Sequence, residues 1–375
     1  MARSKMLRLR NLWLQVHKWI GILLAILIIP LCLSGAALVW DEPIDRALNP
    51  QRYALSAGGP LQPSAYEAAA RNAIAPGERL VSLRIARVAD PVVATAAPAR
   101  PTGVDRGPPL RTNIWIDPAT GRVLDKAPSN AGLVRFLHGL HGTLQLPGLG
   151  RAIVGWIGIF ILLSSLTGLW LWWPLRGRVA RGLRWNRQPS FSVNLHHQLG
   201  FWIAIPLAML SFTGAWISFP SVFGSLAGEA RNPGGDRMRA MRARPLESPQ
   251  LGVDAAVATA TPLAKGRLAA ITWPTDQVPA WKIAFAGKSG PAEIEIDDAS
   301  GAAKAPAPRR PETLSRLMRR WHDGTGMGAV WQAIIFLGGI FPTILAVTGI
   351  IMWLRTRGWR GQLKSRQAAA EARSA

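Results

Sequence analysis

The chain has 375 residues and a formal net charge of +23, from 44 Lys and Arg against 21 Asp and Glu. Such a basic balance is typical of nucleic-acid-binding proteins, but only 17% of the residues are charged, 49% are hydrophobic and 17 are Trp. This composition argues against a nucleic-acid partner and against extensive disorder. The single Cys excludes an intramolecular disulfide and any multi-Cys metal site. A membrane protein remains.

Four segments are long and apolar enough to cross a bilayer as helices, which takes about 20 residues. We place them at 19–40, 152–173, 198–219 and 330–354, and none contains Asp, Glu, Lys or Arg. The first run is longer than the apolar region of a signal peptide, about 7–15 residues, so we expect it to be retained as a span. Cys32, inside this span, is expected to be a small buried residue.

The positive charge is concentrated outside these spans in three short segments. Residues 1–18, 174–194 and 355–375 together hold 16 of the 44 Lys and Arg but only one of the 21 acidic residues. Positive charge marks the cytoplasmic side. We therefore expect a multi-pass protein of a bacterial inner membrane, embedded in the lipid bilayer, with both termini in the cytoplasm. The two long segments, 41–150 and 220–329, would lie in the periplasm.

Each long segment is predicted to form an α+β domain. Helices are expected at 62–75 and 252–264, followed by strands in which apolar and polar residues alternate. The expected strands are 80–88, 112–117, 267–273, 280–286 and 292–297. Residues 117–121 and 297–301 predict hairpin turns with Gly at a positive φ. The Pro-rich stretch 98–111 is expected to be a linker, with a substrate-contacting flap as the alternative.

The chain contains an internal repeat with an offset near 180 residues. His17 and Gly21 recur as His196 and Gly200, and His141 recurs as His322. We predict two tandem parallel repeats, each a helix, an external domain and a second helix, related by a pseudo-two-fold axis along the membrane normal. Small residues recur in any helix interface, but that does not explain the matching histidines.

The histidines are the candidate functional residues, because all six lie near a predicted membrane boundary. His17 and His196 lie at the cytoplasmic ends of the spans, while His141 and His322 lie at the external ends. Two facing imidazoles can hold the iron of a haem from both sides. The alternative is an interfacial histidine bonded to backbone or lipid headgroups. Zinc is disfavoured, because two histidines leave it short of ligands.

Several neighbours leave the assignment open. His138 lies on the same face of a helix expected over 130–146 and is an alternative ligand to His141 or a contact for a haem propionate. His197 adjoins His196 but points about 100° away around the helix. Four arginines near the external site are candidates for propionate contacts, with headgroup anchoring as the alternative: Arg135, Arg151, Arg319 and Arg320.

These features resemble the PepSY-associated transmembrane family over nearly the whole chain. The matching motifs are His-x-x-x-Gly followed by Ser/Thr-Gly, Trp40-Asp41-Glu42-Pro43, Trp172-Trp173-Pro174 and Trp321-His322-Asp323-Gly324. The external segments are similar to PepSY domains.

The resemblance implies an oxidoreductase of the kind that reduces ferric siderophores at the inner membrane. Two haem b groups would be bound, one by His17 and His196 and the other by His141 and His322. Electrons would cross the bilayer to a ferric siderophore or other ferric chelate in the periplasm, where Fe(II) is released. The cytoplasmic segments are too short for a dinucleotide-binding unit, so the donor would be membrane quinol or a cytoplasmic reductase.

Two other functions stay open at this point. The chain can be a non-catalytic PepSY membrane protein that regulates a periplasmic partner. It can also be a protein that binds or transfers haem without reducing a chelate.

Overall fold

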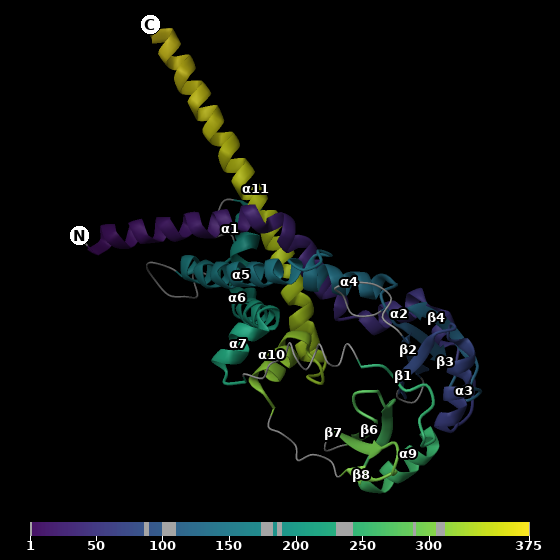
Figure 1. Cartoon of the computed structure of the whole chain (residues 1–375). Helices are drawn as coiled ribbons and strands as arrows, with labels where there is room; N and C mark the ends of the chain where they lie inside the picture. The colour runs from purple at the N-terminus through teal and green to yellow at the C-terminus, as the bar shows by residue number, and fades with distance from the viewer. Residues whose placement is uncertain are drawn as a thin grey trace. The chain divides into compact units, whose positions relative to one another are not determined.

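The computed structural model describes residues 2–85, 90–99, 110–173, 183–185, 190–229, 243–287, 290–304 and 312–374. The chain divides into two compact units (Figure 1). The helical unit comprises Met1–Asp41, Phe136–Ala230 and Glu312–Ala375, and the sheet unit comprises Glu42–Arg135 and Arg231–Pro311. We describe each unit by itself.

Four long helices form the helical unit: α1 (Ala2–Leu38), α5 (Gly150–Trp172), α6 (Phe191–Ser218) and α11 (Ala329–Ser374). Each contains a stretch long and apolar enough to cross a membrane. These stretches coincide with the four predicted spans, while α1 and α11 continue well beyond them. The protein is therefore a multi-pass membrane protein.

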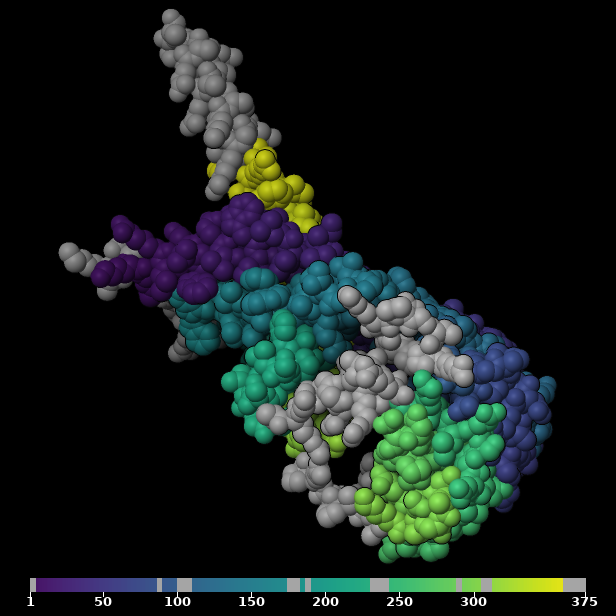
Figure 2. All heavy atoms as spheres, viewed as in Figure 1, coloured from purple at the N-terminus to yellow at the C-terminus, as the bar shows by residue number. Residues whose placement is uncertain are grey.

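The four helices pack through aliphatic and small side chains. α5 packs on α6 and α1 on α11, and Figure 2 shows the surface of α1, in purple, directly beside that of α5. The shared core includes Ile28, Cys32, Ile161 and Leu207, and the burial of Cys32 confirms its predicted role. A Cβ at Gly339 would lie 2.5 Å from the carbonyl oxygen of Cys32, so only glycine permits this approach of α11 to α1.

In the described part of this unit there are also three shorter helices: α4 (Leu133–Thr143), α7 (Pro220–Leu226) and α10 (Leu314–Asp323). α4 lies within the helix expected over 130–146. The boundary between the units falls at residue 135, so most of α4 belongs to the helical unit rather than to an external domain spanning 41–150. α10 begins at a Thr313 cap, whose hydroxyl accepts the Arg316 amide, and ends at Gly324 in the left-handed region.

The described residues of the sheet unit form an antiparallel sheet of eight strands in the order β4-β3-β2-β1-β5-β6-β7-β8. Its strands are β1 (Glu78–Arg84), β2 (Val92–Pro98), β3 (Thr112–Ile116), β4 (Val123–Pro128), β5 (Arg267–Thr272), β6 (Ala280–Gly287), β7 (Gly290–Asp297) and β8 (Ala303–Lys304). The first four strands come from one long segment and the last four from the other. Leu83 of β1 pairs with Ile271 of β5, so segments expected to form two domains share one sheet.

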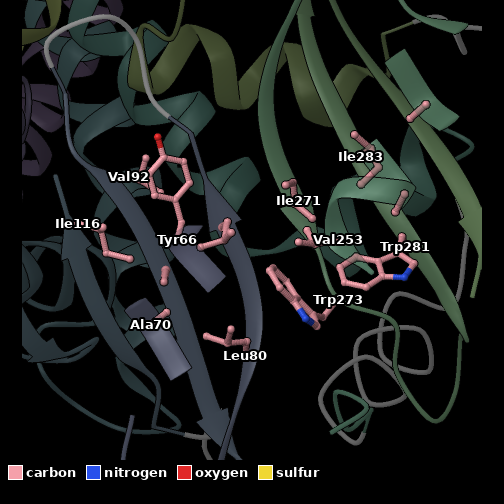
Figure 3. Packing of buried hydrophobic residues seen from close by; sticks show 14 of the residues in the cluster. Tyr66, Ala70, Leu80, Val92, Ile116, Val253, Ile271, Trp273, Trp281 and Ile283 are labelled. Atoms are coloured by element: carbon pink, nitrogen blue, oxygen red, sulfur yellow. The ribbon is translucent and has the colours of Figure 1, made fainter. Parts of the chain in front are cut away.

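Short helices cover and flank this sheet: α2 (Asp41–Leu48), η1 (Pro50–Tyr53), α3 (Pro63–Ala73), α9 (Val253–Ala260) and η3 (Thr261–Leu263). α3 packs on β1 to β4, α9 packs on β6 and β7, and the two helices touch each other. One core therefore unites both strand sets, with Tyr66 and Leu80 from the first segment and Ile271, Trp273 and Trp281 from the second (Figure 3).

Both predicted hairpin turns are confirmed. β3 pairs with β4 and β7 with β8, and φ is +73° at Gly121 and +66° at Gly301. In each turn a carboxylate accepts the backbone amide two residues later: Asp117 from Ala119 and Asp297 from Ala299.

The predicted strands and helices also have counterparts in the structure. The five expected strands correspond to β1, β3, β5, β6 and β7, and the two expected helices correspond to α3 and to α9 with η3. Part of the first strand (86–89), most of the 98–111 stretch and most of the basic segment 174–194 lie outside the described residues.

Candidate functional site

The helical unit brings the four repeat-related histidines together in two pairs. The first pair is His17 of α1 and His196 of α6, whose ring centroids are 6.3 Å apart. The second pair is His141 of α4 and His322 of α10, with centroids 5.9 Å apart. Each pair therefore combines one histidine from the first half of the chain with its counterpart from the second half.

A glycine on a neighbouring helix lies against every one of these imidazoles. A Cβ added at Gly168 or Gly214 would be 3.0 Å from the Cε1 atom of His17 or His322, and one at Gly35 would be 2.6 Å from that of His141. At Gly349 the corresponding distance, to His196, is 3.6 Å. The four glycines follow Ser34, Thr167, Thr213 and Thr348. Each Ser/Thr-Gly motif thus lies directly against one of the four histidine rings.

The Nδ1 atom of each ring is held by the helix that supplies the glycine. Backbone carbonyl oxygens lie 2.9 to 3.1 Å from the Nδ1 atoms of three rings, in the pairs His141 with Leu31, His17 with Ser164 and His322 with Leu210. Each of these carbonyls belongs to the residue three positions before the Ser or Thr of the motif.

His196 follows the same pattern through a hydroxyl. Its Nδ1 lies 2.9 Å from Thr348 Oγ1, and the ring also has a backbone hydrogen bond with Leu345, again three positions before the Thr. The Thr213 hydroxyl lies 3.1 Å from His322 Nδ1 in addition to the carbonyl. The Ser34 hydroxyl instead donates to the Leu31 carbonyl, which His141 also uses.

These contacts determine which ring nitrogen is available for a ligand. A carbonyl oxygen can only accept, so we assign the proton to Nδ1, which donates to it. Nε2 then keeps its lone pair, as in histidines that bind metals. Burial lowers the pKa of His141, and burial together with the neighbouring His141 lowers the pKa of His322 to about 4. The second pair is therefore neutral at pH 7.

Each pair of imidazoles suits a metal whose remaining ligands come from a cofactor and not from the protein. Among the described residues, no three His, Cys, Asp or Glu side chains cluster into a metal site, so an ion that needs four protein ligands is not served. An iron porphyrin needs only two axial imidazoles. With metal–nitrogen bonds of about 2.0–2.1 Å on both sides, the two ring centroids would be about 6 Å apart, which matches both pairs.

The glycines four residues after His17 and His196 also leave room. A Cβ at Gly21 would meet nothing within 4 Å, and one at Gly200 would meet only a Leu345 methyl at 3.9 Å. A flat macrocycle can approach backbone at such positions. The first pair therefore fits haem by ring spacing and by local space.

The structure separates the alternative histidines from the paired ones. His138 is exposed on α4, whereas His141 on the same helix faces His322. His196, rather than the adjacent His197, faces His17. The repeat favours His141 and His196, and the ring contacts agree with that selection.

The candidate arginines lie in different surroundings. Arg320 forms an ion pair of 3.3 Å with Glu312, and Arg151 is exposed at the start of α5. Arg135 is exposed on α4. Arg319 instead lines a small cleft beside Trp216 and Ser315.

The carbonyls that hold the histidines cannot be identified from the sequence. Their signal is the Ser/Thr-Gly pairs, which recur with the same offset as the histidines. Such pairs are also typical of ordinary helix contacts. Their role emerges only when each motif lies beside a histidine of another helix.

The four apolar helices, the antiparallel α+β unit and the paired histidines define a multi-pass membrane protein with two pairs of facing imidazoles. The family model of the PepSY-associated TM region matches residues 14–356. The chain belongs to this family, which confirms the resemblance found in the sequence. A search of curated proteins finds no match to the chain.

Proposed function

We propose that the protein is a haem-containing reductase of a bacterial inner membrane. It carries electrons across the bilayer to a ferric siderophore or a similar ferric chelate. One haem b would be held by the Nε2 atoms of His17 and His196, and the other by those of His141 and His322. The observation that carries this proposal is the two imidazole pairs, with every ring oriented by the Ser/Thr-Gly segment of a neighbouring helix.

The residues around each pair have definable tasks. The carbonyls of Ser164, Leu31 and Leu210 accept the Nδ1 protons, which fixes the ring orientation and makes Nε2 a stronger donor. An aliphatic core extends from Leu31, beside His141, to Leu345, beside His196. When bound, haem would supply the one-electron redox chemistry.

The topology of the proposal follows from charge and repeat. The basic segments support a cytoplasmic position for both termini, which would place the second pair on the periplasmic side. The repeat offset and the sheet order, in which four strands from each half meet at β1 and β5, support two tandem halves. Membrane quinol or a cytoplasmic reductase would deliver electrons to the first pair.

At the external side, each ferric ion would accept one electron and become Fe(II). The lower charge weakens its attraction to the oxygen ligands of the chelate. The iron would then be released, and the siderophore would remain chemically intact.

Absorption spectroscopy of the purified full chain tests the haem. Sharp b-type bands on dithionite reduction and about two haems per chain are expected for two bis-histidine sites. His17→Ala and His141→Ala should each remove about one haem, because each leaves an iron with a single axial ligand. If the chain is expressed with haem supplied and still purifies without bound haem, the proposal is contradicted and a non-catalytic role is favoured.

Single-turnover reoxidation tests the substrate. The dithionite-reduced protein, freed of reductant, is mixed with a panel of ferric siderophores and the reduced bands are followed. Rapid reoxidation with Fe(II) captured by a ferrous chelator is expected. Bound haem without reoxidation by any ferric chelate would favour haem binding or transfer.

A further inference from the structure

A small cleft opens on the helical unit where α6 ends and α10 begins. It has a volume of about 140 Å³ and is lined by Trp216, Ile217, Pro220, Ser315, Arg316 and Arg319. α10 packs against both α6 and α7, which holds the walls together (Figure 1). The Trp216 indole donates to Ser315 Oγ at 3.1 Å and stacks on Phe223, so this wall is fixed in place.

The cleft combines two cations with an apolar wall. Among the described residues, no acidic side chain lines it, and neither the Arg316 nor the Arg319 guanidinium has an ion-pair or hydrogen-bond partner. The nearby Glu229 carboxylate accepts the Ser315 amide at 3.1 Å, at the start of α10. Arg320, the next residue along the helix, differs because Glu312 neutralises it. Two guanidinium groups in this setting favour an oxyanion, which they can bind in bidentate fashion.

The position of the cleft at the end of a membrane-spanning helix indicates where that oxyanion comes from. Trp216 and Ile217 belong to the last turn of an apolar helix that ends at Ser218, where an indole is typical of the membrane interface. The adjoining α7 exposes Val222 by 54% and Leu226 by 76%. Apolar groups this exposed beside a span are suited to the headgroup and upper acyl region.

We propose that this cleft binds an anionic phospholipid. The phosphate would lie between the guanidinium groups of Arg316 and Arg319. The glycerol and the first acyl carbons would lie against Trp216, Ile217 and Pro220. Phosphatidylglycerol would be preferred over phosphatidylcholine, whose choline cation would be repelled by the two arginines.

Native mass spectrometry of the full chain in detergent tests this site. Phosphatidylglycerol is titrated against wild type, the Arg316→Gln/Arg319→Gln double variant and Arg320→Gln. The double variant should weaken binding at least about tenfold, because it removes the charge-assisted hydrogen bonds to the phosphate. Arg320→Gln removes the same charge from a neighbouring, already paired guanidinium and should leave the affinity within about twofold.

A charge-conserving variant and a second lipid complete the test. The Arg316→Lys/Arg319→Lys variant keeps both charges and should recover most of the binding, which separates a binding defect from a folding defect. Equal retention of phosphatidylcholine and phosphatidylglycerol would overturn the proposal. A loss of affinity in Arg320→Gln as large as that in the double variant would also overturn it. Inorganic phosphate that binds with the same arginine dependence, while phosphatidylglycerol does not bind, would assign the cleft to a soluble anion instead.

Discussion

Four glycines decide how closely the histidines can approach neighbouring helices. Each lies where a methyl group would collide with, or touch, an imidazole. Glycine is unfavourable inside a helix by about 1 kcal/mol relative to Ala. Its presence at all four positions, directly after Ser or Thr, is therefore explained by the rings that lie against it.

Replacing one of these glycines should disturb a single site. In Gly35→Ala the new Cβ would be 2.6 Å from Cε1 of His141, so the ring must move away from the Leu31 carbonyl. We expect haem content to fall from about two to about one per chain, since an axial ligand is displaced. Pyridine haemochrome analysis measures this.

Gly358→Ala is the matched control, because its Cβ would meet nothing within 4 Å. It should retain the haem content of the wild type. Full haem content in Gly35→Ala would show that His141 does not need its present position to bind haem.

The two pairs differ in the angle between their rings, so the two proposed haems would give distinct signals. The ring planes of His17 and His196 are 89° apart, whereas those of His141 and His322 are 33° apart. In low-spin ferric haem the relative orientation of the axial imidazoles sets the splitting of the iron d orbitals. Electron paramagnetic resonance should show one highly anisotropic signal and one rhombic signal. His196→Ala should abolish the anisotropic one, and loss of the rhombic signal instead would reverse the assignment.

The turn between β3 and β4 contains a buried carboxylate. Asp117 is fully buried and accepts the amides of Ser56 and Ala119 and the hydroxyl of Thr120. Burial alone would raise the pKa of Asp117, but these hydrogen bonds outweigh it and the pKa lies below its ordinary value. Asp117 therefore contributes stability above the unfolded-state pKa of about 3.9, and this contribution is lost as the pH falls through the lower folded-state value.

Asp117→Asn should reveal this dependence. Thermal unfolding of the full chain should occur at a lower temperature in Asp117→Asn than in wild type at pH 6. The difference should narrow progressively below pH 4. Asp254→Asn is a control on α9, because that carboxylate accepts a single exposed amide, from Ser64. A constant difference across the pH range would mean that the charge of Asp117 contributes nothing.

The elements that could be predicted from the sequence are those with a clear period or turn. The four spans follow from apolar length, and β6 and β7 from the alternation of residues such as Trp281 and Ile283. β2 was missed because Val92–Pro98 is rich in Ala and buried on both faces, which removes the alternation. α7 and α10 were missed because they are short and adjoin longer apolar or polar runs.

For the site, the sequence predicts which histidines form pairs but not what they contact. The common offset pairs His17 with His196 and His141 with His322 without any knowledge of geometry. It could not show that Gly168 lies under His17, because that contact depends on how α1 and α5 pack. Nor could it distinguish Arg319, in the cleft, from Arg320, which is paired with Glu312.

Across the helical unit, each proposed haem would join the two halves of the chain. His17 is held by α5, and both belong to the first half of the chain. His196 is held by α11, and both belong to the second half. An iron between them would therefore link two helix pairs that otherwise touch through apolar packing. A ligand bound only by the folded state stabilises that state, so haem removal should lower the unfolding temperature of this unit.

Paired histidine variants test that link. His17→Ala and His196→Ala would each release the same haem, so the double variant should unfold at nearly the same temperature as either single variant. His17→Ala combined with His141→Ala would release both haems and should show roughly the sum of the two losses. Differential scanning calorimetry of each full-length variant measures these unfolding temperatures. Additive effects within the first pair would mean that the two histidines act independently.

The shared sheet has a consequence during synthesis of the chain. β1 pairs with β5, yet on the order of 180 residues, including α5 and α6, are translated between them. At roughly 5–20 residues per second, the β1 edge would wait about 10–40 s for its partner. An unpaired edge strand is a template for aggregation. In the proposed topology, periplasmic chaperones or the membrane surface would therefore have to shield the first segment until the ribosome delivers the second.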